Sequence, residues 1–316
     1  MKTLLIGSDT QGIIHHTKDA FLEQNEEIQG IFVSNPLEIV PEEIPSINTC
    51  LGIKNFYQDK DVRDALLTKH IKVTDRPRIS TLYALFNGKK FSDWMEVSYS
   101  SRLMTGDVGP NVGFITGIGF PVDVNLFEAV PSMEKLQDFL HGIKYQGEVV
   151  CGLADNYLLT DINFGHYFGH FGMFSEISKN TTQQLIDFMF GIFSDAELHS
   201  SLCISNLVSQ QPFPIIGRTK KPTINTPKAA DKHIWRVLLQ GVLEVILITV
   251  HGRDLGEAKF RLSQTLRNMQ KYNHDLQFRV DYGQRPKFVL SKEKFEKSKL
   301  SYMRTQKNGV PPAVCP

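Results

Sequence analysis

The chain has 316 residues, of which 41% are hydrophobic and 22% are charged, and its mean hydropathy is −0.20. This composition is typical of a globular protein, and a chain of this length buries about 75% of its unfolded surface without disulfide or metal staples. A formal net charge of +1 supplies no general attraction to nucleic acid or anionic lipid, so neither is expected as a partner.

The cysteines and the apolar runs indicate in which cellular compartment the protein is expected. Four cysteines are scattered without a C-x-x-C pair, so neither a zinc ribbon nor a disulfide framework is expected. The run from Met1 to Ile6 is too short for a signal peptide, and Val242–Val250 is too short to span a membrane. We therefore expect a cytoplasmic protein, in the host cytoplasm if the gene is viral. The sequence leaves open whether it forms a homo- or hetero-oligomer.

The first elements indicate a short parallel α/β unit. Thr3–Ile6 is a β-rich run that ends in Gly7, a helix is expected over Gln11–Gln24, and Gly30–Val33 reads as a second strand. His15 and the histidine after it then lie on the surface of that helix rather than forming a ligand pair. Further on, a short helix at 61–69 and a strand at 71–73 are expected.

The middle and end of the chain alternate between hairpin and helix patterns. Two strand-like runs between Ile79 and Val97 flank Asn87-Gly88, a dipeptide that is typical of a tight hairpin turn. The other expected elements are a helix over 132–143, a hairpin of 148–153 with 157–162, a helix over 181–193 capped by Thr181 or Thr182, a strand over 243–249, a helix over 256–271 and a strand over 276–280.

Four short motifs occur in a fixed order. Residues 106–113 read GDVGPNVG, residues 142–153 read GIKYQGEVVCGL, residues 160–165 read TDINFG, and residues 279–285 read RVDYGQR. In this series the chain resembles the glycinamide ribonucleotide synthetase (phosphoribosylamine–glycine ligase) family of the ATP-grasp superfamily, in a truncated and divergent form.

The resemblance implies a fold and a division into domains. The fold is expected to be α+β or α/β: a reduced ATP-grasp fold with a short N-terminal parallel α/β unit and a C-terminal mixed α/β domain. The expected boundaries are a stunted N-terminal α/β domain over 1–75, a domain like the ATP-grasp large lobe over 76–195, a C-terminal α/β domain over 196–290, and a tail over 291–316.

The resemblance also implies a substrate site. The residues carried over are Asp107, Gly109, Pro110, Asn111, Gly113, Arg279 and Arg285. Backbone amides of the glycine-rich stretch 106–119 can hold an anion, and paired arginines can clamp a phosphate. The alternatives are that the glycines only set the path of the chain and that Arg279 is a surface residue paired with Asp281.

A metal site is implied on the following strand. Asp161 and Asn163 alternate, so both point to one face, where hard oxygen ligands suit Mg²⁺ bound to ATP phosphates. The alternative is two hydrated polar groups at the end of a strand. His166 and His170 have a metal-like spacing, but the glycine-rich aromatic segment around them does not read as a helix, so zinc is not expected.

Two functions from different classes follow. The first is an ATP-dependent carboxylate–amine ligase that uses ATP and Mg²⁺, as the resemblance implies. The second is a non-catalytic descendant that binds a phosphoribosyl ligand or serves as a protein–protein scaffold. Residues 36–87 hold one glycine, Gly52, and no glycine-rich loop with a lysine, and residues 75–78 are basic where the family is acidic. Because phosphoryl transfer depends on such lysines and Mg²⁺, these departures favour the second function.

Overall fold

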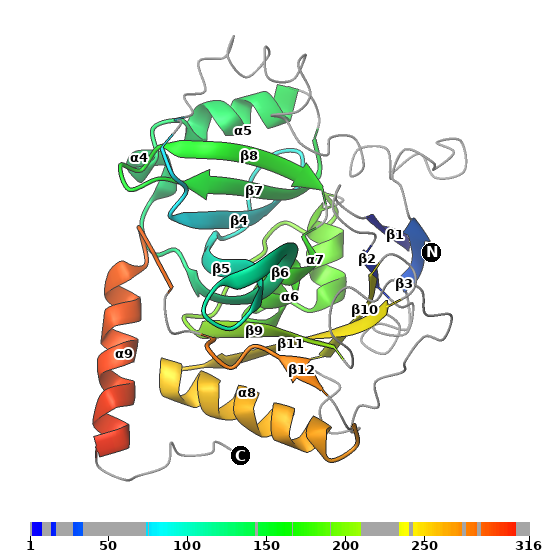
Figure 1. The fold of residues 1–316 in the computed structure, drawn as a ribbon. Helices are drawn as coiled ribbons and strands as arrows, with labels where there is room; N and C mark the ends of the chain where they lie inside the picture. The colour runs from blue at the N-terminus through cyan, green and yellow to red at the C-terminus, as the bar shows by residue number, and fades with distance from the viewer. Residues whose placement is uncertain are drawn as a thin grey trace.

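A computed structural model describes residues 2–7, 14–16, 28–33, 74, 76–142, 145–165, 167–189, 191–209, 234–239, 243–273, 276–282 and 286–307. The strands are β1 Lys2–Gly7, β2 Ile14–His16, β3 Ile28–Val33, β4 Ser80–Phe86, β5 Met95–Met104, β6 Val108–Pro121, β7 Gly147–Leu153, β8 Leu159–Gly165, β9 Leu202–Ser209, β10 Ile234–Leu239, β11 Leu243–Gly252 and β12 Gln277–Phe278. The helices are α4 Leu126–Ala129, α5 Met133–Gly142, α6 Phe168–Glu176, α7 Thr182–Met189, α8 Leu255–Gln270 and α9 Lys292–Lys307. The expected mixed α/β class is confirmed (Figure 1).

One large sheet organises the molecule. It has ten strands in the order β2-β10-β11-β9-β6-β5-β4-β7-β8, with β12 paired to β9 off this path, and every pairing in it is antiparallel. β1 and β3 form a separate parallel pair, as expected of the N-terminal unit. The sheet runs through all three predicted domains, since β2 of the first pairs with β10 of the third, and β9 of the third pairs with β6 of the second. The domain boundaries themselves remain a prediction.

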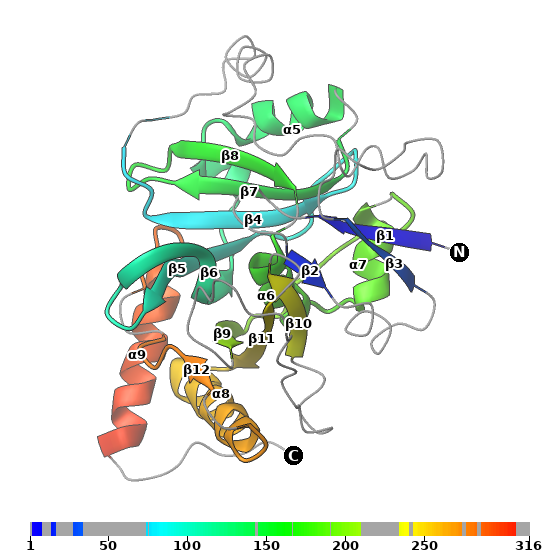
Figure 2. The same cartoon turned by 45° about the vertical axis from the view of Figure 1, so that its right-hand side comes forward.

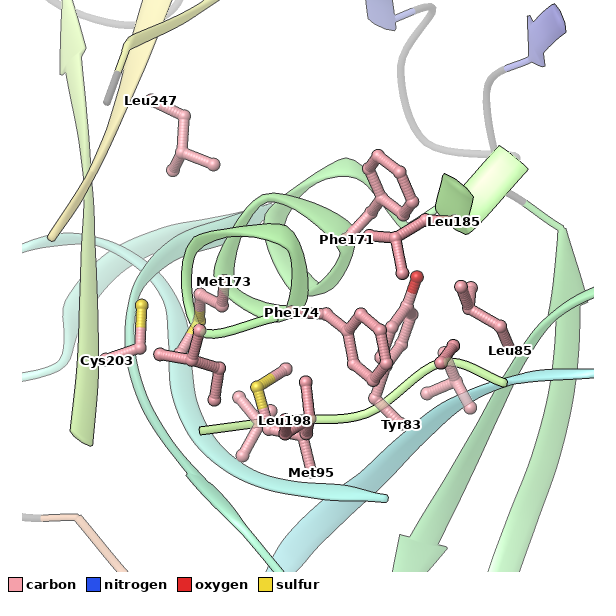
Figure 3. Packing of buried hydrophobic residues seen from close by; sticks show 14 of the residues in the cluster. Tyr83, Leu85, Met95, Phe171, Met173, Phe174, Leu185, Leu198, Cys203 and Leu247 are labelled. Atoms are coloured by element: carbon pink, nitrogen blue, oxygen red, sulfur yellow. The ribbon is translucent and has the colours of Figure 1, made fainter. Parts of the chain in front are cut away.

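Helices cover the sheet on both faces, and the described buried residues form three clusters. α4 and α5 cover β4, β7 and β8 on one side (Figures 1 and 2). α6 and α7 lie on the opposite side, where Phe171, Phe174 and Leu185 pack with Tyr83 and Leu85 of β4 (Figure 3). α8 covers the far face of β9 and β11, and α9 packs on α8. Because side chains alternate along a strand, β9 sends Cys203 toward α6 and Ile204 toward α8, and both are fully buried.

Several expected elements are confirmed at their turns and caps. At the end of β4, Gly88 has φ +88°, and the amides of Lys89 and Lys90 donate to the Asn87 side chain, so the Asn-Gly turn forms. β5 then begins only at Met95. The helix predicted from residue 181 is α7: the Thr181 hydroxyl accepts from the amide of Gln184, whose side chain accepts from the Thr181 amide.

Two local predictions need correction, and three further elements were not predicted. Ile14–His16 is a strand paired with β10 rather than part of a helix, so the two histidines are not on a helix surface. Phe168–Glu176 is a helix, although its glycines and aromatic residues argued against one. The elements not predicted are β9, β10 and the 16-residue helix α9, which lies within the stretch assigned to the tail. The predicted helix at 61–69 and strand at 71–73 lie outside the described residues.

Among the helices described here, none combines the length and apolarity needed to cross a bilayer.

Candidate functional site

The glycine-rich stretch is mostly a strand, and only its first residues form a turn. Val108 pairs with Met104 in a hairpin whose loop contains Gly106 and Asp107, with φ +82° and +59°. Glycine adopts this left-handed conformation at little cost, and aspartate is one of the few other residues that tolerates it. Gly109 also has a positive φ of +84°, and a Cβ there would lie 3.2 Å from Cγ of Met104. These residues are therefore required by the course of the hairpin.

The side chain of Arg279 fastens this hairpin to the segment after β12. Its Nε and Nη2 donate to the two oxygens of Asp281 at 2.7 and 2.5 Å. Its Nη1 donates to Asp107 at 2.8 Å, to the Ser100 hydroxyl at 2.5 Å and to the carbonyl of Arg102 at 3.0 Å. The Arg279 side chain is only 5% exposed, so these protein acceptors replace water around the guanidinium.

The charges of this cluster stabilise one another. Hydrogen bonds from Ser100 and then Arg279 hold the pKa of Asp107 below its usual value. Burial raises the pKa of Asp281, but hydrogen bonds from Arg279 and from the Gly106 amide, at 2.8 Å, outweigh burial, so that pKa is also lowered. Both carboxylates are thus kept ionised against the guanidinium.

The structure brings two of the predicted substrate residues, Asp107 and Arg279, into direct contact. The alternative in which Arg279 pairs with Asp281 is observed, except that the arginine is buried rather than on the surface. Three more of the predicted residues lie in β6, namely Pro110, Asn111 and Gly113. The side chains of Pro110 and Asn111 are outside the described residues, and so is Arg285. Ser100 was not predicted; its sole sequence signal is the alternation of β5.

A second group of polar residues lies on β8 and on the segment before β4. The hydroxyl of Thr160 donates to Asp161 Oδ1 at 2.5 Å, and Arg78 Nη1 lies 3.6 Å from Asp161 Oδ2. The side chains of Arg78 and Asp161 are 42% and 28% exposed. Asn163 is on the same strand two residues later, with its side chain outside the described residues.

Gly152 of β7 lies directly beneath the side chains of Arg78, Thr160 and Asp161. A Cβ at this position would lie 1.9 Å from Asp161 Oδ1, 2.2 Å from Thr160 Oγ1 and 2.9 Å from Arg78 Cδ. No side chain fits between them, so the close approach of the three groups depends on a glycine here.

Aromatic rings continue the surface from Arg78 toward α6. The guanidinium carbon of Arg78 lies 5.3 Å from the ring centroid of Tyr99, which stacks on Phe114 with centroids 5.5 Å apart. His170 lies behind them and is 3% exposed. The centroid of its ring lies within 5.8 Å of the ring centroids of four aromatic residues, Tyr83, Tyr99, Phe114 and Tyr167.

His170 is a neutral residue of the core. Burial, together with the nearby charge of Arg78, lowers the pKa of His170 to about 3. Its Nε2 is buried without a hydrogen-bond partner in the described structure. Among the described residues, no group of three or more histidine, cysteine, aspartate or glutamate side chains is placed to hold a metal.

The polar group on β8 does not fit Mg²⁺ as it is arranged here. Each oxygen of Asp161 faces a hydrogen-bond donor, Thr160 or Arg78, and the second of these is a permanent cation. Magnesium at Asp161 and Asn163 therefore stays a prediction from the resemblance. The basic run at 75–78 was the only sequence signal for Arg78.

Comparison with known proteins gives only distant likenesses. No family model and no curated protein matches the chain. Solved structures that match include the phosphoribosylamine–glycine ligase of Thermotoga maritima (16% identity, 64% of this chain and 55% of that one, TM-score 0.46) and the Kluyveromyces lactis urea carboxylase (10%, 84% and 27%, 0.47). A biotin carboxylase domain of a single-chain bacterial carboxylase also matches (8%, 96% and 82%, 0.43). The chain thus spans 55% of the length of that ligase. Likenesses of this size assign neither a family nor an activity, so the function rests on the residues.

Proposed function

We propose that this chain is a binding protein for a phosphate-bearing small molecule, built on a ligase-like sheet, and that it does not carry out ATP-dependent ligation. The observation that carries the proposal is the Arg279 cluster. The guanidinium expected to clamp a substrate phosphate donates instead to Asp107, Asp281 and Ser100. A buried arginine that is satisfied by its own chain supports the hairpin rather than a substrate.

Ligand binding is supported by the group around Arg78. The side chain of Arg78 is 42% exposed, and its guanidinium carbon lies 5.3 Å from the ring centroid of Tyr99. Among the described residues its ion-pair partner is Asp161, at 3.6 Å. A guanidinium that is held in place and partly open to solvent matches phosphate or carboxylate oxygens. A phosphoribosyl compound is the ligand class that the sequence motifs imply.

The experiment measures binding and turnover separately. Ribose 5-phosphate should raise the melting temperature of the wild-type protein, and ribose without the phosphate should not. Arg78→Gln should abolish the shift. Arg76→Gln is the matched control, because Arg76 belongs to an exposed ion pair with Asp155 at 3.1 Å and loses the same charge. Phosphate release from Mg-ATP with glycine should stay at background.

Two outcomes would overturn the proposal. Turnover of ATP above background would restore the ligase, which is the second candidate function because the partly exposed Asp161 lies where the motif resemblance places a metal ligand. No shift at millimolar ribose 5-phosphate would leave the protein–protein scaffold as the better interpretation.

A further inference from the structure

Arg78, on the segment before β4, and Asp161, on the outer strand β8, form an ion pair where the resemblance implies a divalent ion. A divalent ion at this carboxylate would share its oxygens with the donors already there and would lie close to the charge of Arg78. Here Oδ1 accepts from Thr160, and Oδ2 faces the Arg78 guanidinium. A guanidinium stays charged at every physiological pH, so it repels a divalent ion under all ordinary conditions.

The chain holds Arg78 in this place by three separate contacts. Tyr99 presents its ring to the guanidinium, Asp161 supplies the countercharge, and the missing side chain of Gly152 lets the Arg78 stem lie against the backbone of β7. These contacts come from β5, β8 and β7, so the position of Arg78 is set by the sheet and not by its own flexible side chain.

We propose that the Arg78 guanidinium takes the place of a divalent cation beside Asp161, so that an anionic group of the ligand binds this face of the sheet directly and without metal. This inference deepens the proposed function. The binding of an anionic ligand rests on that function, whereas the exclusion of metal does not. The exclusion of metal by Arg78 is a property of the free protein. A pyrophosphate or sugar phosphate bound here contacts the remaining N–H groups of the guanidinium.

The first test uses Mn²⁺ as the probe, detected by electron paramagnetic resonance of the free ion in titrations of the full chain. Wild type and Asp161→Asn should bind Mn²⁺ equally weakly. Arg78→Gln should bind one ion roughly tenfold tighter or more, because a charge within a few ångströms of the site is removed. Arg78→Lys should keep the ion out, and Arg78→Gln with Asp161→Asn should return to the wild-type level.

Two results of this titration would contradict the inference. One is a wild-type Mn²⁺ site that disappears in Asp161→Asn, since the carboxylate then binds metal despite Arg78. The other is an Arg78→Gln variant that binds no more Mn²⁺ than wild type or the Arg76→Gln control. Unchanged near-ultraviolet circular dichroism of each variant shows that the fold is intact.

The second test uses ribose 5-phosphate as the probe in the presence of EDTA or of excess Mg²⁺. The thermal shift of the wild-type protein should be the same in both. A shift that requires Mg²⁺ overturns the inference but leaves the proposed binding function standing. If ribose 5-phosphate does not bind at all, the proposed function fails and the Mn²⁺ titration still decides the inference.

Discussion

At the scale of single residues, the nearly buried charge of Arg279 explains the position of Asp107. Asp107 and Arg279 lie 172 positions apart, and their contact ties the β5–β6 hairpin to the segment after β12. The residues that resemble a substrate motif thus fulfil a structural requirement of this chain, whatever else they bind. Two predictions belong to this cluster.

We expect Arg279→Ala to destabilise the protein by about 3 kcal/mol or more, since it leaves the nearly buried carboxylate of Asp281 without its partner. Urea unfolding followed by circular dichroism measures the change. Arg76→Ala removes an exposed arginine and should cost less than about 1 kcal/mol. Equal costs for the two variants would contradict the structural role of Arg279.

The same cluster predicts a dependence of stability on pH. The pKa values of Asp107 and Asp281 are both lowered in the folded protein. Their contribution is therefore fully present above the unfolded value of about 3.9, and it is lost as the pH falls through the lower folded values. Wild type should lose stability below about pH 4 more steeply than Asp281→Asn. Parallel curves in urea titrations from pH 6 to pH 3 would contradict this assignment.

At the scale of elements, one buried carboxylate binds the segment that leads into the C-terminal helix α9. Glu96 of β5 is 0% exposed and accepts the amides of Val289, Leu290 and Ser291 at 2.6, 3.0 and 2.6 Å, and the Ser80 hydroxyl at 2.5 Å. These amides belong to the segment that leads into α9 (Figure 1). A carboxylate with two acceptor oxygens satisfies all of them at once.

Glu96→Gln should therefore loosen α9. The amide nitrogen of glutamine cannot accept, so at least one buried N–H loses its partner, at a cost of about 1–3 kcal/mol. Hydrogen exchange followed by mass spectrometry should show faster exchange in α9 and an unchanged rate in β7. Glu293→Gln, a change of the same kind at a side chain that is 90% exposed, is the control and should leave α9 as it is. Equal exchange rates of α9 in Glu96→Gln and Glu293→Gln would contradict the role of Glu96 in holding this helix.

At the scale of the whole molecule, the continuous sheet bears on the predicted domain boundary after residue 195. Strands β6 and β9 pair across this boundary from Thr116–Asn206 to Gly119–Cys203, and the cluster around α6 takes residues from both sides. If the sheet unfolds as one unit, Cys151 on β7 and Cys203 on β9 should become reactive together. Burial raises the pKa of both thiols, so neither reacts in the folded state.

Pulse labelling of wild-type protein in increasing urea, with each thiol identified by peptide mass, tests this prediction. We expect the same midpoint for Cys151 and Cys203. A lower midpoint for Cys203 would show that the C-terminal region opens by itself, as two separate domains would.

The sequence by itself determined the elements whose patterns are local. The helix α8 follows from apolar residues at helical spacing, and Asp254 caps it through the amide of Glu257. The hairpin of β7 and β8 and the capped start of α7 follow from equally short signals. The four motifs also put Asp107 and Arg279 in one predicted substrate site; the two side chains are in contact, and their role in binding a substrate stays a prediction.

Tertiary structure decided whether a segment became a helix or a strand wherever the local sequence signals disagreed with the final fold. Phe168–Glu176 is a helix despite two glycines because it is packed on the sheet, and a Cβ at Gly169 would lie 2.4 Å from Cγ of Phe114. β9 is buried along its whole length, so it lacks the polar alternation that marks a half-exposed strand. The orientation of polar groups was also beyond the sequence, because a pattern shows which residues are charged but not which partners they find. Only the packed sheet sets Arg78 beside Asp161, and Arg279 beside Asp281 and Asp107.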